Sequence, residues 1–467
     1  MDRDDFLDEL LARIRSHLEG ADSVVEYFNS SSLGKTCDLS IPLEGMGTEM
    51  VMSDIDAYLR HCVRTDHPGF MNPLWGGLNL AAFAGEIIAS MTNTSMYTFE
   101  LAPMATLIEQ ALIKRMCEMI GFGEGNGTLT TGGSNGNMLG IMCARQQADP
   151  IGQRQGYDGR KYVLFVSSES HYSVLMAANV LGIGYDNVIK VACDDDGCMR
   201  VDRLEEEIHR SRSEGKTPFC VVATAGTTVR GAFDPIRDVS EICLREGLWL
   251  HVDAAWGGTC LFSAKHRTLM DGIDLADSVC WDAHKMMGVP LICSAFIVKR
   301  PEILRRTCSH GDAAHYLFHE SGDGVDLGRM SLQCGRRNDA LKLFFAWRER
   351  GDAGWARMVE DYMVLAAHLE TLVSNHPSLE MMSSRQWTNV CFRYRAEGID
   401  HDEVNIELRD RMMRKGDFMI SRSTINDVIT LRPVISNPSV TLEDLSRLID
   451  EIVSTGDEII RGIPELI

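Results

Sequence analysis

The chain has 467 residues, and its 46 Lys and Arg against 67 Asp and Glu give a formal net charge of −21 at pH 7. A chain of this length exceeds what one growing core supports, which excludes a small binding module and predicts two or three structural units around a large buried core. So negative a chain repels phosphate backbones and anionic lipid, and we expect no nucleic-acid partner and no membrane partner.

The cysteine pattern indicates a reducing compartment. None of the 14 cysteines is spaced C-x-x-C, and Cys220, Cys280 and Cys293 lie inside apolar runs. They are interpreted as small buried hydrophobes, with no metal site. The acidic N-terminus resembles neither a signal nor a transit peptide, and no apolar run approaches the ~20 residues that cross a bilayer. The prediction is a cytoplasmic protein.

Three segments are expected in chain order. Residues 1–66 carry amphipathic helical patterns too short for their own core, so they are predicted to pack on a larger body or a partner subunit. Residues 67–338 form the large domain, which begins with helical patterns at 78–91 and 102–120. Residues 339–467 form a smaller α+β domain, with helices at 340–350, 355–374, 402–415 and 441–454 and strands at 390–394 and 428–433.

The large domain alternates apolar strand patterns with helical patterns. Strands joined by helices and apolar on both faces predict a mostly parallel sheet covered on each side, an α/β fold. Ligands of such folds bind at the carboxyl ends of the strands. Strands are predicted at 163–166, 188–191, 219–223, 248–252, 278–281 and 295–298, with helices at 201–212 and 234–246.

Two of these strands end in residues of opposite charge. Asp253 follows an apolar run, and Lys285 comes directly after a histidine where another run breaks into a turn. A lysine placed this way can form a Schiff base with pyridoxal phosphate, and a strand-end carboxylate can keep the pyridine nitrogen protonated. Taken singly, Asp253 is also compatible with a helix cap and Lys285 with an exposed cation.

Other polar residues fall at the same predicted edge. Residues 130–137 have the sequence TTGGSNGN and precede a predicted helix. The free backbone N–H groups at the start of this helix, together with Ser134 and Asn135, can bind a phosphate group. The same segment is also compatible with an ordinary glycine turn that caps a helix. His171 follows a strand and can stack on a pyridine ring or serve a structural role. Residues 224–228, TAGTT, carry hydroxyls that can reach a ring substituent or a substrate carboxylate, or they form an ordinary turn. The occurrence of all these features together with Asp253 and Lys285 favours a cofactor site.

Several motifs resemble the group II pyridoxal-phosphate-dependent amino-acid decarboxylases, nearest to the glutamate and cysteine sulfinate decarboxylases. The similarity runs from about residue 67 to 452. The motifs are HVDAAWGG at 251–258, DAHKMMG at 282–288, NTSMYTFELAP at 93–103, AGTTVRGAFD at 225–234, QCGR at 333–336 and VISNP at 434–438.

The resemblance implies a homodimer of the aspartate-aminotransferase fold (fold type I) with the active site at the subunit interface. It places the cofactor on Lys285, Asp253 on the ring nitrogen and His171 on one ring face. Further contacts with the cofactor are implied for Ala255, Gly133, Ser134, Asn135, Thr227 and His284. Contacts with the substrate are implied for Arg432, Asn72, Trp75 and Tyr97, and Arg432 is expected to bind the α-carboxylate.

Two departures from the family bear on activity. Pro73 replaces a glutamine that contacts acidic substrates, which puts glutamate itself in doubt. The loop at residues 319–326 lacks the tyrosine that protonates the intermediate after carbon dioxide leaves, and the nearest tyrosine is Tyr316. Arg230 is interpreted either as attracting a side-chain acid or as a solvated loop residue.

The expected activity is α-decarboxylation of a small acidic L-amino acid, with cysteine sulfinate, aspartate, glutamate and a less common amino acid all open. The missing tyrosine leaves an alternative, decarboxylation coupled to oxidative deamination, which releases an aldehyde. Transamination or β-elimination is a third possibility. A catalytically silent relative would require the cofactor residues to be degraded, and they are present.

Overall fold

The computed structural model describes residues 1–156, 159–308, 318, 326–396 and 398–462. These residues form two compact units. The larger unit is Leu78–Ala366 with Ser383–Asn389, and the smaller unit is Met1–Gly77, Ala367–Met382 and Val390–Ile467.

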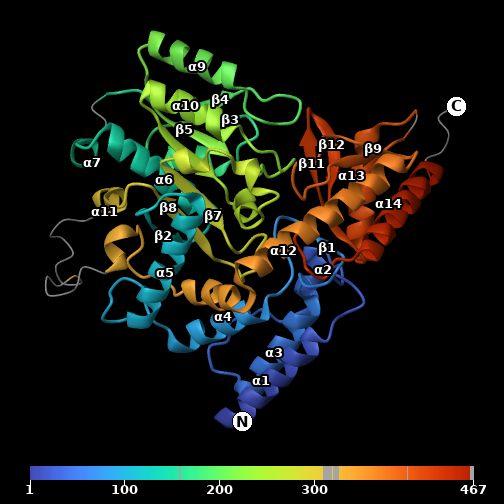
Figure 1. The fold of residues 1–467 in the computed structure, drawn as a ribbon. Helices are drawn as coiled ribbons and strands as arrows, with labels where there is room; N and C mark the ends of the chain where they lie inside the picture. Colours follow the sequence, from blue (N-terminus) through green and yellow to red (C-terminus); the bar gives the residue numbers. More distant parts are fainter. Residues whose placement is uncertain (157–158, 309–317, 319–325, 397, 463–467) are drawn as a thin grey trace. The chain divides into compact units, whose positions relative to one another are not determined.

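The larger unit is built from alternating helices and strands (Figure 1). Its helices are α4 (Leu80–Thr92), α5 (Pro103–Ile120), α6 (Gly133–Ala148), α7 (Gly152–Gln155), α8 (Ser173–Val180), α9 (Val201–Ser213), α10 (Ile236–Glu246), α11 (Glu302–Cys308) and the first part of α12 (Ala340–Asn375). Its strands are β2 (Asn126–Thr130), β3 (Tyr162–Ser167), β4 (Val188–Val191), β5 (Thr217–Thr224), β6 (Trp249–Asp253), β7 (Ser278–Asp282) and β8 (Ser294–Val298).

The strands of the larger unit form one seven-stranded sheet in the order β2-β8-β7-β6-β5-β3-β4. The pairs β3 with β4, β3 with β5, β5 with β6 and β6 with β7 are parallel, whereas β8 runs antiparallel to both β7 and β2. The predicted mostly parallel α/β sheet is therefore confirmed. Because β5, β6 and β7 are parallel, their carboxyl ends meet at one edge.

Both faces of this sheet are covered. Leu164 and Val166 of β3 join a buried cluster with residues of α6 and α8, while Val163 and Phe165, which point to the other face, are also fully buried. Helices α9 and α10 pack against β5. Double coverage explains why these strands read as continuous apolar runs in the sequence.

The smaller unit combines a five-stranded sheet with helices (Figure 1). The sheet has the order β1-β11-β12-β10-β9. Its elements are α1 (Arg3–Leu18), α2 (Ser30–Thr36), α3 (Thr48–His61), β1 (Phe70–Met71), β9 (Leu379–Met381), β10 (Phe392–Tyr394), α13 (His401–Lys415), β11 (Met419–Ile425), β12 (Val428–Arg432) and α14 (Leu442–Gly462).

The two units differ from the predicted division into residues 1–66, 67–338 and 339–467. Residues 1–77 belong with the C-terminal residues, because β1 pairs in parallel with β11 through Phe70 and Met419. The first part of α12 belongs to the larger unit. The two helices predicted at 340–350 and 355–374 meet at Gly351, whose φ of 60° interrupts α12.

The sequence patterns missed strands that are short or polar. Strand β2 carries little apolar surface in its sequence NGTLT, and β11 carries the polar residues of MISRSTI. Strand β2 is held by backbone pairing with β8, which is distant in sequence, whereas β11 forms a hairpin with β12 through a turn at Asn426 and Asp427. Local periodicity does not report such pairing.

The cysteines of the described chain are all unpaired, and Cys220, Cys280 and Cys293 are buried, as predicted. Among the described residues, no helix is both long enough and apolar enough to cross a membrane.

Candidate active site

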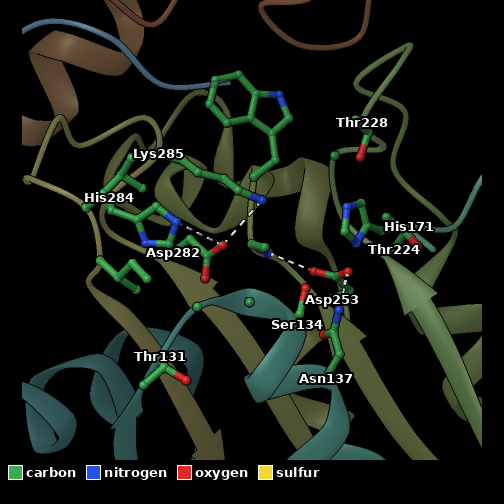
Figure 2. A pocket seen from close by; sticks show the side chains of 17 residues that line it. Thr131, Ser134, Asn137, His171, Thr224, Thr228, Asp253, Asp282, His284 and Lys285 are labelled. Carbon is green, nitrogen blue, oxygen red and sulfur yellow. Dashed lines mark hydrogen bonds and ion pairs between the residues drawn. The ribbon is translucent and has the colours of Figure 1, made fainter. Parts of the chain in front are cut away.

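A cavity of about 270 Å³ opens at the carboxyl edge of the seven-stranded sheet. Its lining includes Thr224, Asp253 and Asp282, the last residues of β5, β6 and β7. The start of α6 and the segment after β3 complete the wall (Figure 2). The cavity thus occupies the position at which parallel α/β sheets bind their ligands.

Lys285 extends into this cavity beside Asp282 (Figure 2). Its Nζ atom lies 3.3 Å from Oδ2 of Asp282, whose side chain is almost completely buried. Burial opposes the charge on the amine, but the carboxylates of Asp282 and Asp253 outweigh it and raise the pKa of Lys285 above its ordinary value. Without a ligand, Lys285 is therefore held as an ammonium.

Asp253 stands across the cavity from Lys285 with both carboxylate oxygens bound (Figure 2). The Asn137 side chain donates to Oδ2 at 2.7 Å, and the backbone N–H of Ala255 donates to Oδ1 at 3.1 Å. Hydrogen bonds to the charged form favour the carboxylate and fix its orientation. The side chain is therefore suited to hold a proton on a ring nitrogen in the cavity.

His171 and Thr224 lie on the same side of the cavity as Asp253 (Figure 2). Burial, only partly offset by Asp253, lowers the pKa of His171, so its imidazole is neutral at pH 7. The backbone N–H of Ser173 donates to Nδ1 of His171 at 3.2 Å, which orients the ring. A flat neutral ring at this position is suited to stacking.

The first turn of α6 forms another wall. This helix begins at Gly133 after Gly132, whose φ is 115°, and no side chain caps its free N–H groups. A Cβ atom at Gly133 would lie 2.7 Å from Oδ2 of Asp282, so a larger residue there would displace the carboxylate beside Lys285. An uncapped helix start is a seat for a phosphate group.

These residues fit pyridoxal phosphate. Lys285 provides the amine, Asp253 the partner of the ring nitrogen and the α6 start the phosphate seat. A further observation supports the fit: the hydroxyl of Thr224 is buried at the cavity and has no hydrogen-bond partner among the described residues. A buried polar atom of this kind gains a partner when a polar ring substituent binds.

The cavity brings together most of the predicted cofactor residues, namely Gly133, Ser134, His171, Asp253, Ala255, His284 and Lys285. Asn135 and Thr227 do not line it. Thr227 is fully buried, and its hydroxyl accepts the backbone N–H of Ala232, which stabilises the turn after β5. Thr224 and Thr228 of the same motif face the cavity instead.

The interpretation of Arg230 as a solvated loop residue is wrong. Its side chain is buried, donates to the backbone oxygen of Asp195 at 2.8 Å and lies 3.7 Å from Glu169. It does not line the cavity. Sequence alone could not distinguish these environments, because the partners come from a loop more than 30 residues away.

The predicted substrate residues divide between the two units. Arg432, Asn72 and Trp75 belong to the smaller unit and Tyr97 to the larger, and their contacts with substrate stay predictions. Within the smaller unit, Arg432 is buried and its Nε donates to the Ser421 hydroxyl at 2.9 Å. Tyr316 and residues 319–325 of the loop without a tyrosine lie outside the described residues.

Asp282 and Asn137 are among the cavity residues to which sequence reasoning assigned no role. Asp282 is the first residue of the motif that carries Lys285, and a buried carboxylate three positions before the lysine was a visible signal. Asn137 closes the glycine-rich motif and was not assigned a role. Its contact with Asp253, 116 positions away, is created by the packing of α6 on β6 and β7.

The sheet and this cavity define a pyridoxal-phosphate-dependent enzyme of fold type I. Residues 31–395 match the family model described as the pyridoxal-dependent decarboxylase conserved domain, and the chain belongs to this family. It is a pyridoxal-phosphate-dependent amino-acid decarboxylase, which agrees with the predicted class of enzyme and the predicted cofactor.

Known relatives match nearly the whole chain. Cysteine sulfinic acid decarboxylase of Homo sapiens is 37% identical over 93% of this chain and 92% of its own length. Acidic amino acid decarboxylase GADL1 of Mus musculus is 37% identical over 93% of this chain and 82% of its own. The crystal structure of mouse CSAD has 34% identity and a TM-score of 0.93, covering 97% of this chain and 98% of that chain. The predicted fold class is confirmed.

Proposed function

We propose that this enzyme removes the α-carboxylate of a small acidic L-amino acid as carbon dioxide and releases the amine. The observation that carries the proposal is the placement of Lys285 and Asp253 on facing walls of one cavity. The acidic substrate class is supported by the names of the two relatives that are 37% identical to this chain, since both act on acidic amino acids.

The residues of the cavity divide the work. Bound pyridoxal phosphate supplies a protonated ring that accepts the electron pair left when the carboxylate departs. Lys285 would hold the cofactor through its side-chain amine. Asp253 would keep the proton on the ring nitrogen, and His171 would cover a ring face. Arg432 is proposed to bind the substrate carboxylate, because a guanidinium binds a carboxylate through two parallel hydrogen bonds.

The test measures carbon dioxide released by the purified holoenzyme from cysteine sulfinate, aspartate, glutamate and a panel of apolar and aromatic amino acids. We expect release from an acidic substrate and none from the Lys285→Ala variant. Borohydride reduction followed by mass spectrometry should locate the cofactor on residue 285. Reaction with apolar or aromatic amino acids alone would refute the acidic substrate class.

Neither the described residues nor the relatives at 37% identity support the oxidative alternative. Oxygen uptake and ammonia release, measured in the same assay, separate the two reactions. Simple decarboxylation gives carbon dioxide with neither, whereas equal amounts of carbon dioxide and ammonia would replace the proposal with the oxidative reaction.

We also propose that the enzyme is a homodimer. Helices α4 and α5 carry large apolar side chains that are exposed in the single chain, such as Leu80 (62% exposed), Met91 (72%) and Met104 (65%). An exposed apolar surface on two adjacent helices is typical of an interface. Sedimentation of the purified protein should give twice the mass of the 52.0 kDa chain, and a stable monomer would contradict the proposal.

A cytoplasmic location is part of the same proposal. It is supported by the 14 cysteines, which are all unpaired in the described chain. Persistent thiols are usual in a reducing compartment. Cell fractionation followed by immunodetection tests it, and recovery from an oxidising compartment would contradict it.

A further inference from the structure

A continuous chain of hydrogen bonds leads from the back of Asp253 into the interior of the larger unit. Asn137 of α6 donates through Nδ2 to Oδ2 of Asp253 at 2.7 Å (Figure 2). On the other side of the amide, Oδ1 of Asn137 lies 3.0 Å from Nε2 of His251, a residue of β6. Both side chains are almost completely buried.

The chain continues from His251 to the far end of the strands. Nδ1 of His251 lies 2.8 Å from the hydroxyl of Ser278, the first residue of β7. The same hydroxyl accepts the indole N–H of Trp249 at 2.9 Å. Ser278 and Trp249 are buried as well. Four buried side chains thus stand in line behind the Asp253 carboxylate, and His251 and Ser278 in the middle of the line are fully buried.

The hydrogen-bonding groups in the line determine the direction of every bond in it. An indole N–H only donates, and an ionised carboxylate only accepts. Asn137 donates to Asp253 through Nδ2 and therefore accepts through Oδ1, so Nε2 of His251 carries a proton. In a neutral ring Nδ1 then accepts from the hydroxyl of Ser278, which itself accepts from Trp249. All the donors therefore point toward the carboxylate.

The charge state of the imidazole agrees with this direction. Burial lowers the pKa of His251 to about 4, so the ring is neutral at pH 7 and carries one proton. The packing of α6 leaves space for the ring, since a Cβ atom at Gly140 would lie 2.6 Å from Nδ1 of His251. The glycine allows the helix to approach the imidazole closely.

We propose that Asn137, His251, Ser278 and Trp249 form a positioning relay that holds the carboxylate of Asp253 oriented toward the ring nitrogen of the cofactor. The inference rests on the proposed role of Asp253 in the cofactor site. His251, Ser278 and Trp249 do not line the cavity and act through Asn137, which lines it, and Asp253.

The physical basis of the relay is the cost of a buried carboxylate. Each donor stabilises the charged form, and aligned hydrogen bonds polarise one another in an interior of low dielectric. Removing the Asn137 donor leaves Oδ2 of Asp253 without its bond, so the carboxylate is no longer held toward the ring nitrogen. The ring nitrogen then lacks a fixed anionic partner, so both the affinity for the cofactor and its absorbance change.

The test compares purified holoenzymes by their visible absorbance and by the dissociation constant of pyridoxal phosphate, titrated into protein stripped of cofactor. In Asn137→Leu the amide is replaced by an apolar group of similar size. We expect a dissociation constant about tenfold higher and an absorbance maximum at shorter wavelength. His251→Leu should move both quantities in the same direction by a smaller amount.

Rescue separates positioning from packing. In His251→Gln the side-chain amide can still donate to Asn137, so both quantities should return to within about twofold of the wild-type values. Cys143→Ala is the matched control, because Cys143 lies buried on α6 and its sulfur is bound by Thr307 rather than by the relay. This control should lower the thermal stability and leave the absorbance unchanged.

Several outcomes would overturn the relay. Unchanged absorbance and affinity in His251→Leu would do so, and this variant decides the matter if Asn137→Leu fails to fold. An equal change in Cys143→Ala, or no rescue by His251→Gln, would also count against it. The Asp253→Asn variant distinguishes the relay from the proposed role of Asp253. If Asp253→Asn changes the absorbance and the relay variants do not, only the relay is wrong. If Asp253→Asn leaves the absorbance unchanged, the role of Asp253 itself is wrong.

Discussion

The amine of Lys285 lies 3.3 Å from the carboxylate of Asp282, the residue that ends β7. Asp282 is almost completely buried, faces the cavity and touches the start of α6 through Gly133. This pair keeps the lysine charged in the absence of cofactor. Since only the neutral amine can attack an aldehyde, we expect Asp282 to slow the loading of the cofactor.

The first prediction concerns this pair. Asp282→Asn removes a charge that raises the pKa of Lys285, so the pKa of the amine falls. The rate at which cofactor-free enzyme binds pyridoxal phosphate should then begin to rise at a lower pH, by about one unit. Stopped-flow absorbance across a pH series measures this shift. Asp277→Asn, at the opposite end of β7, is the control and should leave the profile in place.

A second prediction follows from His251. Its pKa is about 4 in the folded protein and 6.5 ordinarily, so between these values the unfolded chain binds a proton that the folded chain does not. The free energy of unfolding therefore falls as the pH falls through this window, by about 2 kcal/mol between pH 7 and pH 5 for this residue.

Urea unfolding of wild type and His251→Gln at both pH values isolates this contribution from other titrating groups. Asp234, whose burial raises its pKa to about 7, has the opposite dependence in both proteins and cancels in the comparison. The stability difference between the two proteins should shrink toward pH 5. Parallel pH curves would show that the imidazole does not titrate as described.

The third prediction concerns Lys342, which is fully buried in the larger unit. Its Nζ lies 2.8 Å from Asp339 and 3.2 Å from Glu86, and it donates to the backbone oxygen of Ile292 in the cavity wall at 2.8 Å. Lys342→Met removes the ion pair of the buried Asp339 and the donor of two backbone oxygens, while Glu86 keeps its ion pair with Arg337. We expect a loss of about 3 kcal/mol in the free energy of unfolding. The affinity for pyridoxal phosphate should fall as well.

Urea unfolding measures the loss. Lys299→Met serves as the control, because Lys299 is exposed and its change should stay within about 0.5 kcal/mol of wild type. Equal stabilities of the two variants would mean that the buried ion pairs around Lys342 do not stabilise the fold.

The fourth prediction tests the substrate carboxylate site. Arg432→Lys retains the charge but loses the planar pair of donors, so KM for the preferred amino acid should rise about tenfold. The visible absorbance of the bound cofactor should stay as in wild type. Arg422→Lys, on the exposed side of β11, is the control. If KM stays within about twofold of wild type, the assigned role of Arg432 is wrong.

The sequence by itself determined the parallel sheet of the larger unit and the residues that end its strands. Strands covered on both faces must be apolar throughout, so β3 to β8 were visible as runs, and Asp253 and Lys285 stood out where those runs stopped. The family motifs then identified the cofactor. These features are local in the chain, and local patterns report them directly.

Only the tertiary structure decided which distant residues meet. Asp282 against Gly133, Asn137 against Asp253 and Arg230 against Glu169 are contacts between segments far apart in sequence, created when α6 and the loops after the strands pack on the sheet. The assignment of residues 1–77 to the C-terminal unit likewise depends on the pairing of β1 with β11. Packing and strand pairing between remote segments leave no periodic signal in the chain, because such a contact depends on both segments and the sequence of one segment does not specify its partner.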